Sequence, residues 1–134
     1  MELKVNTLAP FFCLLSTNNK EYCLKHSKGK IVILYFYPKD DTPGCTLETK
    51  DFNSLLPKFK KFNCEIYGIS KDSIESHHKF KKKYNVKFDL LADEEKKAIK
   101  GYKTWGKKKF MGREFMGLIR STFLIKNQKI IKEW

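Results

Sequence analysis

Cys45 lies in a segment whose composition makes its sulfur a candidate for nucleophilic chemistry. The apolar run 31–37 before it is rich in β-branched and aromatic residues and predicts a buried strand. The amphipathic stretch after it, from about 45 to 61, predicts a helix. We therefore expect Cys45 in the first turn of a helix, where backbone N–H groups and the helix dipole favour a thiolate. The preceding Pro43-Gly44 predicts a tight turn that exposes the sulfur, against the alternative of an inert buried thiol.

A thiolate can attack the weak O–O bond of a peroxide if its surroundings assist. Thr42 can bring a hydroxyl to the same pocket, as donor or acceptor of a hydrogen bond. Pro38 can wall the pocket without adding a competing polar group. Arg120 stands out in a chain with few arginines, because its guanidinium is permanently charged and offers a planar set of donors. From the residues alone, a surface arginine at a strand edge is an equal alternative for Arg120.

The elements that must position these residues alternate between strands and helices. An Asp72–Glu75 capping box is expected to open one of the helices. This order, which closes with a hairpin, predicts an α/β fold with a central mixed sheet flanked by helices, in a single domain over 1–134. We expect an N-terminal hairpin of 11–15 and 21–25, further strands at 65–70, 88–91, 121–126 and 129–133, helices at about 73–84 and 93–102, and a loop at 105–118.

The N-terminal hairpin carries two of the four cysteines. A two-residue turn at 18–19 would place Leu14 opposite Cys23 and Cys13 opposite Leu24. Cys13 and Cys23 would then point to opposite faces of the hairpin and form no disulfide with each other. The cysteines match no zinc spacing, so in a reducing compartment we expect free thiols.

The formal net charge is +13, and lysine supplies nearly all of the positive charge. Specific DNA recognition usually relies on arginine, so non-specific attraction to polyanions is favoured over a dedicated nucleic-acid function. His26, His77 and His78 have no third ligand at a suitable spacing and are expected at the surface. No apolar stretch has the length of a membrane span, and the run 8–15 lacks a cleavage site, so we expect a cytoplasmic protein.

The pattern Pro38-x-x-x-Thr42-x-x-Cys45, with Arg120 ahead of the strand at 121–126, resembles the active-site signature of peroxiredoxins. The longer string at 37–48 is similar to the peroxiredoxin Q group, also called bacterioferritin comigratory protein. This resemblance implies a thioredoxin-like fold and thiol-dependent reduction of hydrogen peroxide or organic hydroperoxides, in antioxidant defence. No metal or organic cofactor is implied.

The same resemblance implies roles for individual residues. Cys45 would be the peroxidatic cysteine and would become a sulfenic acid. Thr42 would hydrogen-bond the bound peroxide, and Arg120 would stabilise the thiolate and the developing charge. Pro38 would shield the intermediate, and Glu48 would support the local network.

The chain departs from the group where a second, resolving cysteine often stands. Lys50 occupies the position five residues after Cys45 and is expected in solvent, and 73–84 contains no cysteine. Cys64 lies beyond the far end of the helix, about 24 Å away, whereas a disulfide requires Cα atoms within about 7 Å. The distance from Cys45 to Cys13 or Cys23 cannot be read from sequence. We therefore expect a one-cysteine cycle in which thioredoxin, glutaredoxin or glutathione reduces the sulfenic acid.

The second departure is the end of the chain at Trp134, where relatives usually continue into a further helix. An apolar sheet face would then stay exposed or be covered by self-association, which predicts a monomer or weak homodimer. Two other functions remain open at this stage: a peroxide sensor that uses Cys45 at low turnover, and a basic nucleic-acid-associated protein.

Overall fold

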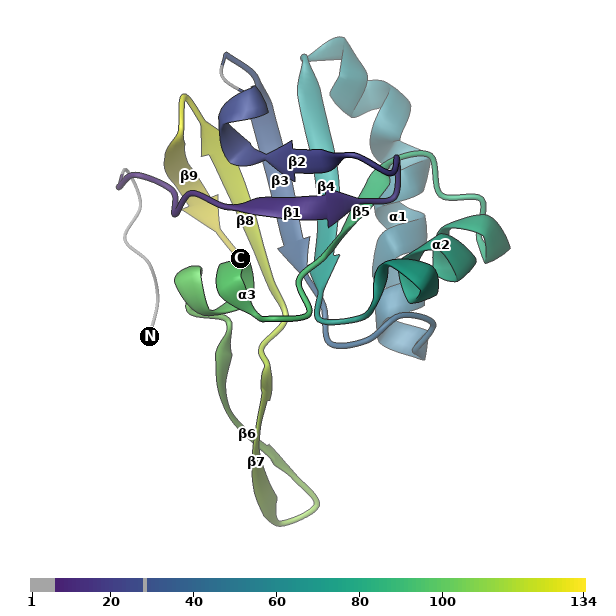
Figure 1. Ribbon diagram of the computed structural model, residues 1–134, viewed down its shortest axis with the longest axis vertical. Helices are drawn as coiled ribbons and strands as arrows, with labels where there is room; N and C mark the ends of the chain where they lie inside the picture. The colour runs from purple at the N-terminus through teal and green to yellow at the C-terminus, as the bar shows by residue number, and fades with distance from the viewer. Residues whose placement is uncertain (1–6, 28) are drawn as a thin grey trace.

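The computed structural model describes residues 7–27 and 29–134. Its main sheet has the strand order β2-β1-β5-β4-β3-β8-β9, and β6 and β7 form a separate two-stranded sheet (Figure 1). Neighbours β3, β4 and β5 are parallel, whereas β8 is antiparallel to β3, which confirms an α/β fold with a mixed sheet. The elements are β1 (Cys13–Ser16), β2 (Glu21–Cys23), a 3-10 helix η1 (Leu24–Ser27), β3 (Ile31–Phe36), α1 (Pro43–Lys61), β4 (Cys64–Ser70), α2 (Ile74–Lys83), β5 (Asp89–Ala92), α3 (Lys97–Gly101), β6 (Trp105–Phe110), β7 (Arg113–Leu118), β8 (Ser121–Lys126) and β9 (Lys129–Glu133).

The central strand β3 is buried on both faces and separates two hydrophobic clusters. Because side chains alternate along a strand, Leu34 and Phe36 enter one cluster, and Ile33 and Tyr35 enter the other. The first cluster is covered by the β1–β2 hairpin and α3, whereas the second is covered by α1 and α2 (Figure 1). Among the described helices, none combines the length and apolar character needed to cross a membrane.

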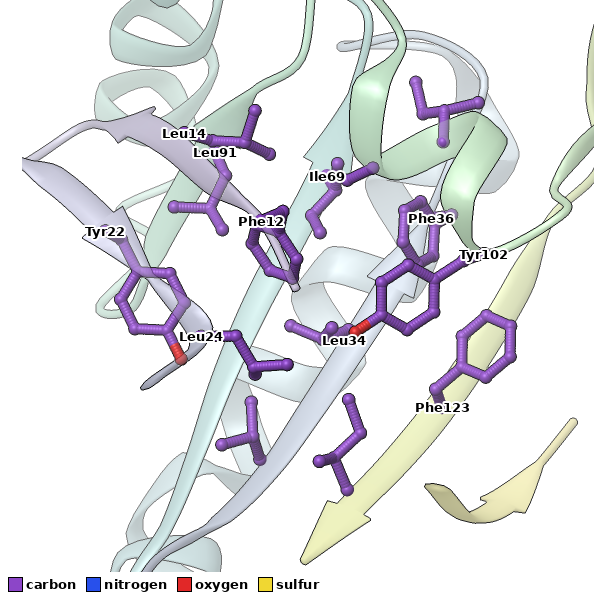
Figure 2. Close-up of a cluster of buried hydrophobic side chains, with 14 of the residues drawn as sticks. Phe12, Leu14, Tyr22, Leu24, Leu34, Phe36, Ile69, Leu91, Tyr102 and Phe123 are labelled. Atoms are coloured by element: carbon purple, nitrogen blue, oxygen red, sulfur yellow. The ribbon is translucent and has the colours of Figure 1, made fainter. Parts of the chain in front are cut away.

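Aromatic rings fill much of the first cluster (Figure 2). The ring centroids of Phe36, Tyr102 and Phe123 lie between 5.1 and 5.7 Å apart, within the range of favourable aromatic pairs. Leu14 and Tyr22 add the inner face of the hairpin to the same cluster. This packing fixes the hairpin against the sheet independently of any covalent bond.

The register of the hairpin differs from the predicted one. The loop spans positions 17–19 rather than 18–19, with Asn19 in the left-handed region at φ 67°. A loop longer by one residue shifts the pairing by one position, so Cys13 lies directly opposite Cys23. Their sulfur atoms are 1.99 Å apart and form a disulfide. The prediction of two free thiols on opposite faces is therefore wrong.

The segment predicted as a loop at 105–118 is an antiparallel hairpin, β6–β7. Its turn is formed by Met111 and Gly112, which both have positive φ, at 52° and 79°. Such a turn matches the twist of paired strands. Most of β7 is exposed, so it lacks the apolar alternation that marks a half-buried strand in sequence.

Two predicted helix starts are also wrong. Ser73, not Asp72, caps α2, and its side chain accepts a hydrogen bond from the backbone N–H of Ser76. The Asp72 carboxylate instead accepts hydrogen bonds from the backbone N–H of Asp40 and from the Ser70 hydroxyl. The helix predicted from 93 begins only at Lys97, because Lys96 before it has left-handed backbone angles. The Asp93 carboxylate accepts hydrogen bonds from the backbone N–H groups of Lys97 and Ile99.

Candidate active site

Cys45 lies in the first turn of α1, which follows the carboxyl end of β3 after the loop 37–42. The helix begins at Pro43, where the missing N–H costs nothing, and Thr42 before it has extended backbone angles. The prediction of an exposed sulfur is wrong, because Cys45 is only 1% exposed and belongs to the second hydrophobic cluster. The first turn faces the sheet, so the position is covered by the strand that delivers it. Burial alone would suit an inert thiol, so any reactivity of Cys45 must come from its polar neighbours.

The decisive neighbour is Arg120, which lies between β7 and β8. Its Nη2 donates a hydrogen bond to the sulfur of Cys45 at 3.1 Å, and its Nη1 donates to Oε1 of Glu48 at 2.9 Å. The guanidinium thus bridges the cysteine and a carboxylate one helical turn further along α1. With a side chain 39% exposed, Arg120 connects the buried sulfur to solvent.

The ionisation of both charged groups reflects this contact. Partial burial opposes the charge of Arg120, but the hydrogen bond to Cys45 and the charges of Cys45 and Glu48 outweigh it and raise the pKa of Arg120. Burial also opposes the charge of Glu48, which for a carboxyl group raises the pKa, although the nearby guanidinium of Arg120 counteracts the effect. Arg120 is therefore a permanent cation beside the sulfur.

Thr42 and Pro38 lie in the loop that precedes α1. The Thr42 hydroxyl donates to the backbone carbonyl of Lys39 at 2.9 Å; within the described residues it makes no hydrogen bond to Cys45. Its oxygen lone pairs stay available to accept a hydrogen bond from a ligand. Pro38 is half-buried in the same loop, and Lys50 on α1 is exposed to solvent as expected.

A buried polar network holds this loop, and sequence reasoning missed it. Asp40 accepts hydrogen bonds from the Tyr37 and Ser76 hydroxyls, at 2.6 and 2.8 Å, and lies 2.7 Å from Nδ1 of His77. The other ring nitrogen of His77 lies 2.9 Å from the carbonyl oxygen of Leu91, which can only accept. The imidazole ring of His77 is therefore held between the Asp40 carboxylate and the backbone of β5.

His77 was predicted at the surface, and that prediction is wrong, since the residue is fully buried. In the lysine-rich helix α2, Phe80 is the apolar residue that shares the buried side with His77, so the sequence pattern gave only a weak indication that His77 is buried. Burial, with help from Tyr35 and Asp40, raises the pKa of Tyr37 well above its usual range and keeps its hydroxyl a donor. The network ties the loop before Cys45 to α2 and β5.

Two further features complete the surroundings of Arg120. A Cβ atom added at Gly44 would lie 3.3 Å from Nη2 of Arg120, so the missing side chain leaves room for the guanidinium. A groove of about 410 Å³ runs from Gly44 and Arg120 along α1, and its lining includes Leu47, Phe52 and Leu55. It offers an apolar surface next to the charged contact.

The other cysteines lie elsewhere. Burial and the charge of Glu65 raise the pKa of Cys64 to about 11, which keeps this thiol protonated near neutral pH. Cys13 and Cys23 are joined on the hairpin, and with Glu21 their possible ligand atoms lie within 4.8 Å of one another. Because the disulfide engages both sulfurs, this group cannot bind a metal ion in the state described.

Known proteins resemble this chain along most of its length. The sequence pattern described as the AhpC/TSA family matches residues 5–134. A protein of Helicobacter pylori named putative peroxiredoxin bcp is 47% identical over 98% of this chain and 87% of its own length. Peroxiredoxin Bcp of Bacillus subtilis is 44% identical over 100% of this chain and 86% of its own.

Among solved structures, a mutant of Xylella fastidiosa PrxQ superposes with a TM-score of 0.93 at 30% identity. The match covers 100% of this chain and 86% of that one, which confirms the thioredoxin-like peroxiredoxin fold. The chain therefore belongs to the AhpC/TSA family, and within it to the peroxiredoxin Q or bacterioferritin comigratory protein group of thiol-dependent peroxidases.

Proposed function

We propose that Cys45 is the peroxidatic nucleophile and that Arg120 is the group that makes its chemistry possible. The observation that carries this proposal is the 3.1 Å hydrogen bond from Nη2 of Arg120 to the sulfur. A fixed cation at this distance stabilises a thiolate, and its planar donors can also contact a peroxide oxygen. Glu48 orients the guanidinium through the 2.9 Å bond to Nη1.

In the first step the Cys45 thiolate attacks the terminal oxygen of the peroxide, forming an S–O bond while the O–O bond breaks. The cysteine becomes a sulfenic acid, and the leaving oxygen takes up a proton and departs as water or an alcohol. Negative charge moves from sulfur to the leaving oxygen, so the donors of Arg120 stabilise both ends of the transfer. Thr42 accepts a hydrogen bond from the bound peroxide, and Pro38 limits access of water to the sulfenic acid.

The groove along α1 supports reduction of organic hydroperoxides in addition to hydrogen peroxide. Its lining includes Leu47, which is 63% exposed, and Leu55, which is 40% exposed, beside the guanidinium of Arg120. An alkyl chain laid against these side chains would remove apolar surface from water, at about 25 cal/mol per Å². The peroxide end of the same molecule would then lie at Arg120.

We further propose that a thiol outside the same chain reduces the sulfenic acid. Cys64 is a poor candidate, because its thiol is buried and protonated. Cys13 and Cys23 lie in the hairpin that covers the first hydrophobic cluster, whereas Cys45 belongs to the second, on the other face of the sheet (Figure 1). A small thiol such as glutathione, or a protein thiol of glutaredoxin or thioredoxin, fits this requirement.

The test is rapid mixing of reduced protein with hydrogen peroxide and with an alkyl hydroperoxide, followed by mass spectrometry. We expect one sulfenic acid at Cys45 and no disulfide between Cys45 and another cysteine of the same chain. Cys45→Ser should abolish peroxide consumption, and Cys64→Ser should not. Sustained turnover with a supplied thiol separates a peroxidase from a sensor. Consumption that survives in Cys45→Ser would contradict the proposal.

A further inference from the structure

The Cys13–Cys23 disulfide has no part in the peroxide-reducing site described above. It joins residues directly opposite each other on β1 and β2, and β2 is an edge strand of the sheet. Cys13 is half-buried and lines a shallow groove with Asp93, Glu94 and Lys97, among others. Cys13 therefore lies close to the surface, whereas Cys23 is buried.

The hairpin does not need the disulfide to keep its shape. Leu14 pairs with Tyr22 across the strands, and both are buried in the first hydrophobic cluster (Figure 2). Phe12 and Leu24 extend the same packing on either side of the cysteines. Since packing and backbone hydrogen bonds hold the strands, reduced thiols would remain opposite each other and ready to re-form the bond. The reduced hairpin and the disulfide-bonded hairpin can therefore share one backbone conformation.

The two sulfur sites lie on opposite faces of the sheet. In Figure 1 the β1–β2 hairpin crosses in front of the central strands, and α1, which carries Cys45, runs behind them. The two hydrophobic clusters fill the space on either side of those strands. A direct bond within one chain would require the sheet to open, so any exchange between these sulfurs must occur between two copies.

Charge at the two sites is complementary, although the whole chain is strongly basic. Exposed carboxylates of Glu21, Glu94 and Glu95 surround the hairpin cysteines, and Lys97 pairs with Glu95 at 3.6 Å. The candidate active site is less acidic: it presents Arg120 and the exposed Lys39 and Lys50, beside Glu48, which pairs with Arg120, and the exposed Asp51. Opposite charges steer two proteins into contact and raise their association rate.

We propose that Cys13 and Cys23 form a second redox centre, a dithiol–disulfide couple that reduces the Cys45 sulfenic acid of a second copy of this chain. The proposal rests on the proposed function, which supplies the sulfenic acid. The couple is then the thiol from outside the same chain that the cycle requires.

The half-buried Cys13 thiolate attacks the sulfenic sulfur of Cys45, forming an S–S bond between the two copies while the S–O bond breaks; the hydroxide that leaves takes up a proton from solvent and becomes water. Cys23 then attacks the sulfur of Cys13, forming the Cys13–Cys23 disulfide and releasing reduced Cys45. Oε1 of Glu21 lies 3.7 Å from Sγ of Cys23 and can take the proton of that thiol. The net reaction converts peroxide and dithiol to alcohol or water, water and disulfide, which an external thiol reduces.

A mixing experiment between two variants tests the transfer. The acceptor is Cys45→Ser, which keeps the hairpin couple, and the donor is Cys13→Ser/Cys23→Ser, which keeps Cys45. Both are reduced, freed of reductant, treated with one equivalent of hydrogen peroxide, alkylated and mapped by mass spectrometry. We expect the acceptor to stay reduced alone and to gain one Cys13–Cys23 disulfide per peroxide when the donor is present, with loss of the donor's sulfenic acid.

Charge variants sharpen the same experiment. Glu94→Gln/Glu95→Gln in the acceptor should slow the transfer about 3- to 10-fold at low salt and have little effect at high salt. Equally fast oxidation of the acceptor without the donor would overturn the relay. So would a donor sulfenic acid that persists beside a reduced acceptor, while the proposed function would stand. A donor that forms no sulfenic acid with peroxide would instead overturn both.

Discussion

Nη2 of Arg120 lies 3.1 Å from the sulfur of Cys45, although 75 positions separate the two residues in sequence. The contact forms because β8 pairs antiparallel with β3, so that the start of β8 lies beside the end of the strand that leads to α1. Sheet topology thus brings a permanent cation to a buried sulfur. We propose that reactivity at Cys45 depends on this contact, because the guanidinium donates directly to the sulfur.

Replacing Arg120 tests this dependence most directly. Arg120→Gln removes the cation and its paired donors, and we expect the second-order rate constant for reaction with hydrogen peroxide to fall about 100-fold. Stopped-flow mixing measures that constant. The matched control is Arg113→Gln, since Arg113 is an exposed arginine at the start of β7. Similar rate constants for the two variants would contradict the role given to Arg120.

Gly44 offers a subtler test of the same geometry. In Gly44→Ala the new Cβ would lie 3.3 Å from Nη2 of Arg120, so the guanidinium must shift away from the sulfur. We expect the peroxide rate constant to fall about 10-fold while the free energy of unfolding stays equal or rises, since alanine favours helix over glycine by about 1 kcal/mol. Gly101→Ala is the control, because its Cβ would meet Pro10 at an ordinary 3.5 Å. A rate unchanged in Gly44→Ala would sink this interpretation.

Glu48 should impose a pH dependence on stability. Burial raises its pKa above the ordinary value of 4.5, so the native state holds this proton more tightly than the unfolded state. Its contribution to stability is therefore complete below pH 4.5 and is lost as the pH rises through the raised pKa. Urea denaturation from pH 4 to 7 should show the wild type losing stability relative to Glu48→Gln. Glu75→Gln, an exposed change on α2, should run parallel to the wild type, and a parallel course for Glu48→Gln would refute the prediction.

The buried pair of Asp40 and His77 should matter mainly for stability. His77→Leu leaves the Asp40 carboxylate buried without its partner, so we expect the free energy of unfolding to fall by about 3 kcal/mol. His78→Leu, a change at the adjacent and more exposed histidine, should cost less than about 1 kcal/mol. Urea denaturation at pH 7 measures both values. In the double variant with Asp40→Asn, part of the loss should be recovered, because the unpaired charge is gone.

Local sequence patterns were sufficient to predict secondary structure wherever that structure depends on interactions between neighbouring residues. The strand at 31–36 and the helix that begins beside Cys45 follow from an apolar run, a proline–glycine turn and an amphipathic period, all of which act over neighbouring residues. The motif around Cys45 also sufficed to identify the family, because its residues are contiguous.

Sequence patterns were insufficient to predict strand register and burial, which depend on contacts with residues elsewhere in the chain. A loop of 17–19 instead of 18–19 costs little in energy, yet it moves Cys13 opposite Cys23 and permits the disulfide. His77 shows the same limit, since its burial depends on Asp40 and on the carbonyl of Leu91, both remote in sequence.

By itself the sequence determined the order of strands and helices outside 105–118, the position of Cys45 at the start of a helix and the family to which the chain belongs. Only the tertiary structure decided which charges meet: it placed Arg120 on the sulfur, buried Cys45 and His77, and set the hairpin cysteines on the far face of the sheet. The reason is that secondary structure follows from interactions between near neighbours. The contacts that tune a reactive group instead depend on sheet pairing and side-chain packing between segments far apart along the chain.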